Sequence, residues 1–231
     1  MLSLMSNITE TPAGILYGEH KRGHLPEQPM APETLRGSHI LKRGALLREP
    51  CYPAHSLVLV GGLPGAGKST LIDRCLDAAD DAQPMMALSV AKMVERDGGD
   101  MGDVTNKILQ QAFEQMLTEA EEAAPATPVI IEATSFSLGM RTSIHDLAVR
   151  TGREAQLLMI QATGKQAASG LRARGYQLDD DVWRNYVRSA GNFDKMLKNY
   201  PDHLDDEGWA SVLLSSRYAA SKISKMVFTA E

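Results

Sequence analysis

The segment that most constrains this chain is residues 62–70, which read Gly-Leu-Pro-Gly-Ala-Gly-Lys-Ser-Thr. It matches the G-x-x-x-x-G-K-[ST] pattern of phosphate-binding loops. A short β-branched apolar run at residues 56–60 precedes it, and residues 68–79 follow with helical spacing. The apolar side chains of that predicted helix share one face: Leu71, Ile72, Cys75 and Leu76. Strand, glycine loop and helix in this order are the context that the motif requires, so a chance match at an ordinary turn is the weaker interpretation.

Each residue type in this loop has a physical reason. A loop that wraps a phosphate chain must point backbone N–H groups inward, which side chains would block, and this explains Gly62, Gly65 and Gly67. The loop runs into a helix N-terminus, which favours an anion. We expect Lys68 to reach the β- and γ-phosphates and the Ser69 hydroxyl to bind Mg²⁺. The expected nucleotide-binding residues are the whole motif: Gly62, Leu63, Pro64, Gly65, Ala66, Gly67, Lys68, Ser69 and Thr70.

Composition narrows the class of protein. The 231 residues suffice for one sizeable domain or for one domain with an extension. The net charge of −5 gives no global basic field of the kind that nucleic-acid binders often carry. This net charge is still compatible with a local basic groove. The two cysteines have no metal or redox spacing, no apolar stretch approaches the roughly 18 residues of a membrane span, and residues 1–10 do not resemble a signal peptide. We therefore expect a cytoplasmic protein that does not enter a membrane; its oligomeric state is not predicted.

The chain is predicted to have three parts. Residues 1–37 are rich in turn formers and hold no regular period, so we expect a partly disordered extension. Residues 38–54 are expected to form a short strand or hairpin and a linker. Residues 55–231 are expected to form the domain.

Within the domain, strands and helices are predicted to alternate. Strands are expected at residues 56–60, 85–89, 129–132, 155–161 and 209–214. Helices are expected at residues 68–79, 103–124 with Asp103 as N-cap, 138–151, 163–174, 179–199 and 215–226. This alternation implies right-handed crossovers and an α/β fold with a doubly wound, mostly parallel sheet of about five strands. The strands read as continuous apolar runs, as strands buried on both faces should.

A carboxylate ends the predicted strand at residues 129–132. In a P-loop protein, a carboxylate at this place faces the phosphates, where Glu132 would hold Mg²⁺ through water or orient an attacking group. The usual residue is Asp, so Glu132 reaches one carbon further; the alternative is a solvated strand-end carboxylate. Thr134 and Ser135 follow and are candidates for substrate or phosphate contact. Capping of the next helix explains Ser135 or Ser137 equally well.

These residues also carry a resemblance. Glu132-Ala133-Thr134-Ser135, followed by Arg141, Leu147-Ala148 and Gly152, is similar to the Asp-Ala-Thr-Asn … Arg … Leu-Ala … Gly pattern of polynucleotide-kinase-like and zeta-toxin-like P-loop ATPases. Residues 171–175, Leu-Arg-Ala-Arg-Gly, resemble the mobile lid of these proteins. The resemblance spans roughly residues 55–225.

The resemblance implies a P-loop kinase-like domain with the loop strand at the centre of the sheet and a helical lid. The implied activity is transfer of the ATP γ-phosphate to a hydroxyl. ATP is the expected nucleotide because the guanine signature Asn-Lys-x-Asp is absent. Arg172 and Arg174 would close over ATP and stabilise the charge of the transferring group, unless they are surface charges on a helix. Arg141 would hold substrate phosphate or pair with a nearby acid; both interpretations stay open.

One departure from the family pattern bears on catalysis. Members often carry an Asp and then an Arg after the second strand, and the Asp accepts the proton of the substrate hydroxyl. Here those positions are Ala91 and Val94. A shifted alignment would let the run Glu95, Arg96 and Asp97 supply both groups. Otherwise Glu132 doubles as the base, or the acceptor needs none. General-base help contributes about 10²–10⁴-fold, so a true loss would imply a slow kinase or another role.

Three functions follow from these observations. The leading hypothesis is an ATP- and Mg²⁺-dependent kinase whose acceptor is a nucleic-acid end, a hydroxymethylated base, a nucleotide sugar or a small metabolite. The second is an ATP-dependent switch or ATPase that acts through a protein partner. The third is a toxin component that a second protein neutralises.

Overall fold

The structure is a computed structural model of the chain. It describes residues 33–34, 37–41, 47–79, 84–99, 105–134, 137–198 and 204–229. Within this part of the chain, no helix is long and apolar enough to cross a membrane.

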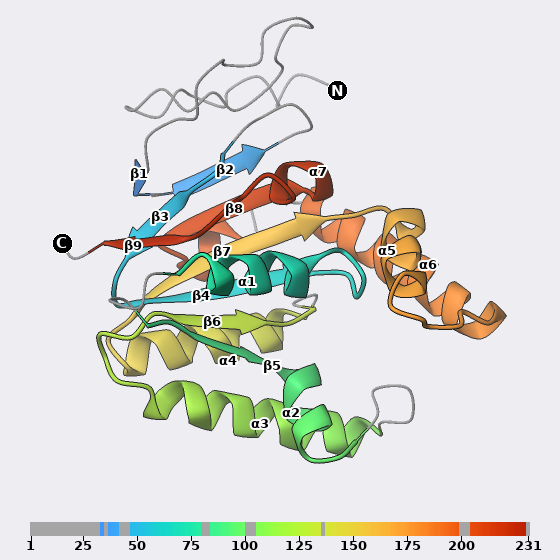
Figure 1. Cartoon of the computed structure of the whole chain (residues 1–231), viewed down its shortest axis with the longest axis horizontal. Coiled ribbons are helices and arrows are strands. Elements are labelled where there is room, and N and C mark those ends of the chain that lie inside the picture. Colours follow the sequence, from blue (N-terminus) through green and yellow to red (C-terminus); the bar gives the residue numbers. More distant parts are fainter. Residues whose placement is uncertain are drawn as a thin grey trace, which may run out of the picture.

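A six-stranded sheet forms the centre of the fold (Figure 1). Its strand order is β2-β8-β7-β4-β6-β5, and all of its pairings are parallel. The strands are β2 (Gly37–Leu41), β4 (Ser56–Gly62), β5 (Met86–Ser89), β6 (Val129–Glu132), β7 (Glu154–Gln161) and β8 (Ser211–Ser216). The predicted doubly wound α/β fold is confirmed, with β4, the strand that leads into the loop, between β6 and β7.

The helices cover both faces of this sheet because side chains of neighbouring strand residues point to opposite faces. In β4, Val58 and Val60 pack with α1, α5 and α7, whereas Leu57 and Leu59 pack with α2, α3, α4 and α6. All four side chains are fully buried. The helices are α1 (Lys68–Asp77), α2 (Val90–Arg96), α3 (Asn106–Glu122), α4 (Leu138–Arg150), α5 (Gly164–Arg172), α6 (Asp180–Lys198) and α7 (Arg217–Ala220). Two buried cores, one on each face, explain why the strands are continuously apolar.

A second, three-stranded sheet has the order β1-β3-β9, from β1 (Glu33–Thr34), β3 (Pro50–Pro53) and β9 (Val227–Thr229). Together with β2 it shows that the segment before residue 55 contributes to both sheets. The strand expected within residues 38–54 is present as β2, and its partner is β8 from the far end of the chain. The five predicted strands of the domain thus gain a sixth at one edge, which sequence spacing did not reveal.

The predicted closing helix at residues 215–226 is wrong over most of its length. Only α7 is helical, and the chain then turns towards β9. Arg74 of α1 donates hydrogen bonds to the carbonyls of Ser221 (3.3 Å) and Ile223 (2.6 Å). These carbonyls are therefore satisfied without a helix, while the Ile223 side chain is fully buried in the core beside α1.

Helix starts follow local capping. Thr105 caps α3, accepting a hydrogen bond from the Ile108 N–H at 3.4 Å, so this helix begins after the predicted position. The expected cap Asp103 lies outside the described residues. Thr163 caps α5 in a reciprocal capping box with Gln166. A short 3-10 helix, η1 (Asp205–Glu207), precedes β8.

Candidate active site

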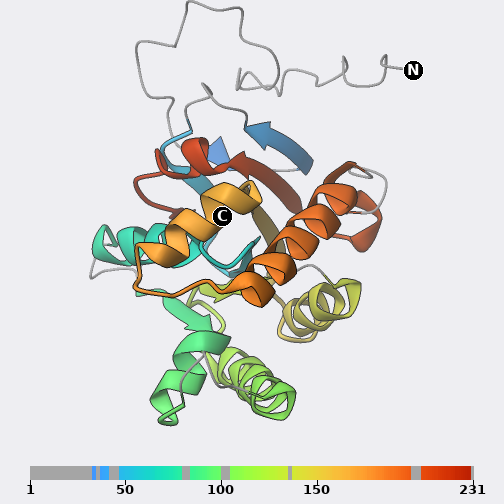
Figure 2. The ribbon, with the colours of Figure 1, turned by 90° about the vertical axis from the view of Figure 1, so that its right-hand side faces the viewer.

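The site lies where the parallel strands end, at the point where the chain crosses from one side of β4 to the other, which is where ligands bind in open α/β sheets. Figure 2 looks onto this edge, with α5 and α6 above and α2 and α3 below. The glycine loop joins the end of β4 to α1. Gly62, Gly65 and Gly67 all have positive φ, at 144°, 78° and 104°, which other residues rarely adopt.

The loop also needs glycine because α5 packs directly on it. A Cβ atom at Gly65 would lie 2.1 Å from the Ala167 carbonyl oxygen, and one at Gly170 would lie 2.1 Å from the Gly65 carbonyl oxygen. Tyr186 of α6 adds a hydrogen bond from its hydroxyl to the Pro64 carbonyl at 3.1 Å. The two helices thus hold the loop in place, α5 through backbone contacts and α6 through the Tyr186 hydroxyl.

Lys68 is buried at the start of α1 with only 6% of its side chain exposed. Its ammonium donates hydrogen bonds to the carbonyls of Gly62 (3.0 Å) and Leu63 (3.1 Å), and Glu132 lies 3.9 Å away. Burial lowers the pKa of Lys68 to about 8; the charge of Glu132 opposes this shift, and that of Arg174 adds to it. The ammonium is thus held beneath the loop in an environment that favours an additional negative charge.

Ser69, Glu132 and Arg174 form a connected group. The Ser69 hydroxyl donates to Glu132 Oε1 at 2.8 Å, and Arg174 Nη2 donates to the Ser69 oxygen at 3.2 Å. Within the described part of the chain, Glu132 Oε2 accepts no hydrogen bond. The predicted magnesium-binding residues Ser69 and Glu132 and one of the two predicted lid arginines, Arg174, are therefore brought together.

The donor set suits Mg²⁺. No group of three or more His, Cys, Asp or Glu side chains able to hold a metal occurs in the described residues. Mg²⁺ does not need one, because it is commonly bound by one or two protein oxygens together with substrate phosphates and waters. Ser69 Oγ and Glu132 Oε1 lie 2.8 Å apart, close to the roughly 2.9 Å between adjacent ligands of an octahedron with bonds of 2.0–2.1 Å. The two oxygens can hold the ion directly, or Glu132 can hold it through water.

A cavity of about 920 Å³ opens from the loop towards α3 and α4. Besides Lys68, Ser69, Glu132 and Arg174, its described lining includes Thr134 and residues from the start of α2, from α3 and from α4. Glu132 is the single carboxylate among these described lining residues. The cavity therefore extends from the phosphate-binding loop past Glu132 to α2, α3 and α4.

The candidate substrate residues do not all lie here. Thr134 lines the cavity, and Ser135 lies outside the described residues; Ser137 caps α4, accepting from the Met140 N–H at 3.2 Å. Ala91, at the position of the expected Asp, also lines the cavity.

The run Glu95, Arg96 and Asp97 lies elsewhere. These exposed residues fall at the end of α2, and none lines the cavity. Arg96 pairs with Glu119 at 2.7 Å and with Asp97 at 3.8 Å. α2 begins at Val90, and its N-terminus points at the cavity. Its C-terminal residues therefore lie away from the cavity, and the alignment in which Glu95, Arg96 and Asp97 supply the base and the arginine is not supported.

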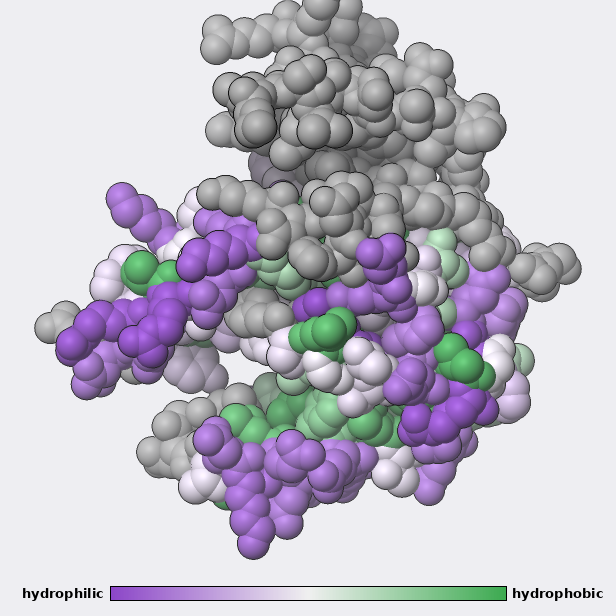
Figure 3. All heavy atoms as spheres, turned by 180° about the vertical axis from the view of Figure 1, so that it is seen from behind, coloured by the Kyte–Doolittle hydropathy of each residue, from purple (hydrophilic) through white to green (hydrophobic). Residues whose placement is uncertain are grey.

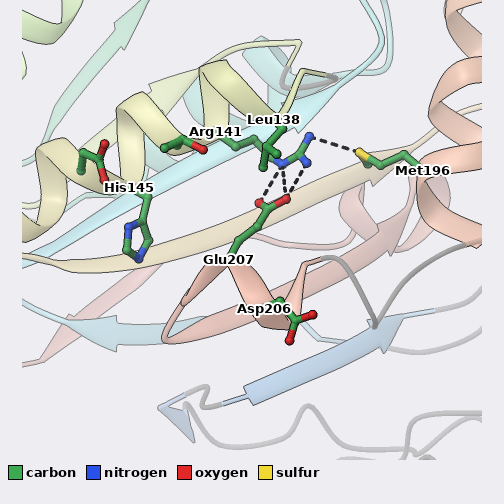
Figure 4. Close-up of a pocket in the computed structure, with 8 residues that line it drawn as sticks. Leu138, Arg141, His145, Met196, Asp206 and Glu207 are labelled. Atoms are coloured by element: carbon green, nitrogen blue, oxygen red, sulfur yellow. Dashed lines mark hydrogen bonds and ion pairs between the residues drawn. The ribbon is translucent and has the colours of Figure 1, made fainter.

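Arg141 pairs with an acid, which was one of its two expected roles. It donates to both Glu207 oxygens, at 2.5 Å from Nη2 and 2.8 Å from Nε, and only 4% of its side chain is exposed. Figure 4 shows this ion pair beside Met196, whose sulfur lies 3.3 Å from Nη1. The pair lines a separate cavity between α4, the end of α6 and η1, so Arg141 is not placed at the γ-phosphate.

Arg172 is also turned away. Its guanidinium lies over the Trp183 ring of α6, 6.0 Å from the ring centre, and it does not line the cavity. Of the two predicted lid arginines, only Arg174 reaches the loop.

Several lining residues were missed from sequence. Asn106, Leu109, Gln110 and Phe113 of α3 line the cavity with the i, i+3, i+4, i+7 spacing of one helix face. That face lies beside the buried residues Ala112 and Met116 of the same helix. The signal that could have found this face is the helical spacing of its polar residues, Asn106 and Gln110.

Comparisons with known proteins place this arrangement in a family. No curated protein matches the chain. Similar solved structures include a gluconokinase from Sinorhizobium meliloti 1021, at 11% identity over 74% of this chain and 89% of that chain, with a TM-score of 0.49. Kti12 of Chaetomium thermophilum in complex with ADP-AlF3 has 16% identity over 69% and 88%, with a TM-score of 0.49. The PezAT toxin–antitoxin system of Streptococcus pneumoniae has 16% identity over 74% and 69%, with a TM-score of 0.47.

Likeness at this level does not bear on what the chain binds. The family evidence comes from residues 57–192, which match the AAA domain of the AAA_33 family and contain the loop, Glu132 and Arg174. This stretch is more than half of the chain, and it confirms the resemblance to P-loop kinase-like ATPases. The chain therefore belongs to the AAA_33 family of AAA domains, with a P-loop kinase-like fold.

Proposed function

We propose that this protein is an ATP- and Mg²⁺-dependent phosphotransferase that moves the γ-phosphate of ATP to a hydroxyl of an acceptor. The observation that carries the proposal is the position of Glu132. One oxygen of this carboxylate accepts a hydrogen bond from the Ser69 hydroxyl, and Glu132 lines a cavity that extends past the loop.

Each residue has a distinct part in the proposed reaction. Lys68 neutralises the β- and γ-phosphates, and Ser69 with Glu132 positions Mg²⁺, which when bound offsets phosphate charge. The acceptor oxygen bonds to the γ-phosphorus as the bond to the β-phosphate oxygen breaks, and ADP leaves. The acceptor proton passes to Glu132 Oε2. Arg174 stabilises the charge on the transferring group, which requires it to exchange its Ser69 contact for phosphate oxygens.

The test is transfer of labelled γ-phosphate from ATP·Mg²⁺ to acceptors in a cell metabolite extract and to DNA and RNA 5′-hydroxyl ends. Wild type should label an acceptor, and Lys68→Ala should not. Lys92→Ala is the matched control, because Lys92 is an exposed lysine paired with Asp73 and should leave transfer unchanged. Glu132→Gln should lower kcat by about 10²–10⁴-fold if this carboxylate is the base. ATP hydrolysis at an unchanged rate with no labelled acceptor would refute the proposal.

A second candidate is an ATP-dependent switch that acts through a protein partner. It is favoured by Ala91, which stands in the cavity where related kinases carry the base. Affinity capture with the full chain separates the two functions: a switch should hold its partner with ATP·Mg²⁺ and release it with ADP. Equal capture with either nucleotide would count against the switch.

A further inference from the structure

The cavity has an acceptor end, which is its described lining beyond the glycine loop, the end of β6 and the lid residues Leu171, Arg174, Tyr176 and Tyr186. It is built from the start of α2, one face of α3 and the first turns of α4. Its residues are Ser89, Val90, Ala91, Asn106, Leu109, Gln110, Phe113, Ser137, Gly139, Met140 and Ser143.

The acceptor end contains no charged side chain. In the described lining of the whole cavity, the charged residues are Lys68, Glu132 and Arg174, and all three lie at the loop. A polynucleotide or phosphorylated acceptor would lose phosphate hydration here without a basic partner, which is costly.

Apolar side chains form much of the acceptor end. Val90, Leu109, Phe113 and Met140 come from three different helices and line it together. Figure 3, which shows the molecule from behind, has hydrophobic residues gathered above the hydrophilic lower edge. Phe113 offers an aromatic surface against which a flat apolar group can pack.

The polar groups at this end are neutral. Gln110 donates its amide N–H to Glu114 at 2.7 Å, which fixes the side chain and leaves its amide oxygen as an acceptor. The Ser143 hydroxyl donates to the Gly139 carbonyl at 3.0 Å, so its oxygen is likewise an acceptor. Asn106 adds an amide one helical turn before Gln110. Such groups recognise hydroxyl and N–H groups of an uncharged ligand.

We propose that the phosphoryl acceptor is an uncharged small molecule with an apolar or aromatic part and hydrogen-bonding groups close to the reacting hydroxyl. This assignment rests on the proposed function. The apolar part lies against Phe113 and Leu109, the polar groups meet the α3 amides, and the hydroxyl points towards Glu132. The acceptor is thereby distinguished from a nucleic-acid end and from a nucleotide sugar.

The test uses matched pairs of acceptors. Nucleosides and aryl alcohols are each compared with their phosphorylated or carboxylated counterparts, and a 5′-hydroxyl oligonucleotide is included. Transfer is followed with labelled ATP, and binding is followed separately by equilibrium dialysis with ADP·Mg²⁺ present. We expect the uncharged member of at least one pair to exceed its charged counterpart by at least about tenfold, both in binding and in kcat/KM.

Two variants link the preference to the acceptor end. Phe113→Ala should weaken binding of the uncharged acceptor about tenfold, whereas Ile108→Ala, an exposed position of the same helix outside the cavity, should not. Gln110→Lys should shift the preference towards the charged member, and Gln111→Lys, exposed and outside the cavity, should leave it unchanged.

The outcomes separate the two proposals. If uncharged acceptors bind as expected but receive no phosphate, the proposed function fails and the site assignment stands. If phosphate goes preferentially to charged acceptors or to the oligonucleotide, the kinase stands and this inference is overturned. Failure of every uncharged compound to bind or react also overturns it.

Discussion

The state of Lys68 leads to a prediction that can be measured without knowing the acceptor. Burial lowers the pKa of this lysine to about 8 from its ordinary value of 10.5. Nucleotide phosphates placed above the loop would return it to the charged form, because opposite charges raise the pKa of a lysine. Binding of ATP·Mg²⁺ should therefore draw a proton from solution whenever the free protein holds Lys68 uncharged.

The size of this effect follows from the same pKa. A group that titrates at about 8 and is fully protonated in the complex takes up about half a proton at pH 8 and about nine-tenths at pH 9. The apparent affinity for ATP·Mg²⁺ should accordingly fall about tenfold between pH 7 and pH 9. Isothermal titration in two buffers of different ionisation enthalpy measures the proton uptake directly.

Two variants serve as controls. Lys68→Met removes the titrating group, so residual binding should take up no proton, while Lys92→Met alters an exposed lysine and should leave the uptake unchanged. Wild-type binding at pH 8–9 without proton uptake would refute the assignment of Lys68 as the buried, phosphate-facing cation.

The same pKa predicts a stability effect with a defined sign. Between pH 8 and pH 10.5 the unfolded chain holds a proton on Lys68 that the folded chain has lost, so the free energy of unfolding should rise with pH. The full gain is on the order of 3 kcal/mol, and it should be missing from Lys68→Met in urea unfolding at each pH.

Three further predictions concern the frame around the site. Gly170→Ala should lower the Tm and weaken nucleotide binding, because its Cβ would lie 2.1 Å from the Gly65 carbonyl oxygen. The control is Gly191→Ala in α6, whose Cβ meets no atom within 4 Å and which should raise the free energy of unfolding by about 0.5–1 kcal/mol. An unchanged Tm in Gly170→Ala would contradict the packing of α5 on the loop. Arg153→Ala should cost about 3 kcal/mol in urea unfolding, because Arg153 donates to four carbonyls between residues 123 and 127, and a neutral result would show that solvent replaces these bonds. Arg141→Leu should cost about 3–5 kcal/mol in urea unfolding at pH 7, because it leaves the largely buried Glu207 carboxylate without its cation and with the Trp209 N–H at 3.0 Å, and an unchanged free energy of unfolding would contradict this cause.

Much of the fold could be predicted because its signals are local. The β-branched run before the loop, the apolar strands buried on both faces, and the helices with one apolar stripe are all visible over short windows. The glycine loop could also be recognised, because its backbone geometry restricts which residue types can occupy each position. These features were enough to predict the order of strands and helices and the place of Lys68, Ser69 and Glu132 beside one another.

The remainder depends on partners far apart in the chain. β2 lies at the edge of the sheet because it pairs with β8 from the far end of the chain. α7 ends early because Arg74 donates hydrogen bonds to the carbonyls that a longer helix would otherwise have bonded. Arg141 pairs with Glu207, which lies 66 residues further along the chain, and no local sequence pattern indicates this partner. The acceptor end is formed by faces of three helices whose relative placement no local pattern supplies.

The central claim is that the γ-phosphate moves from ATP to a hydroxyl, and its most direct test is phosphorus NMR of the full chain with ATP, Mg²⁺ and a metabolite extract. The account predicts one new phosphate monoester for each ADP formed with wild type, and neither product above background with Lys68→Ala. Formation of ADP with inorganic phosphate alone, abolished by Lys68→Ala, would contradict the claim and identify the protein as an ATPase.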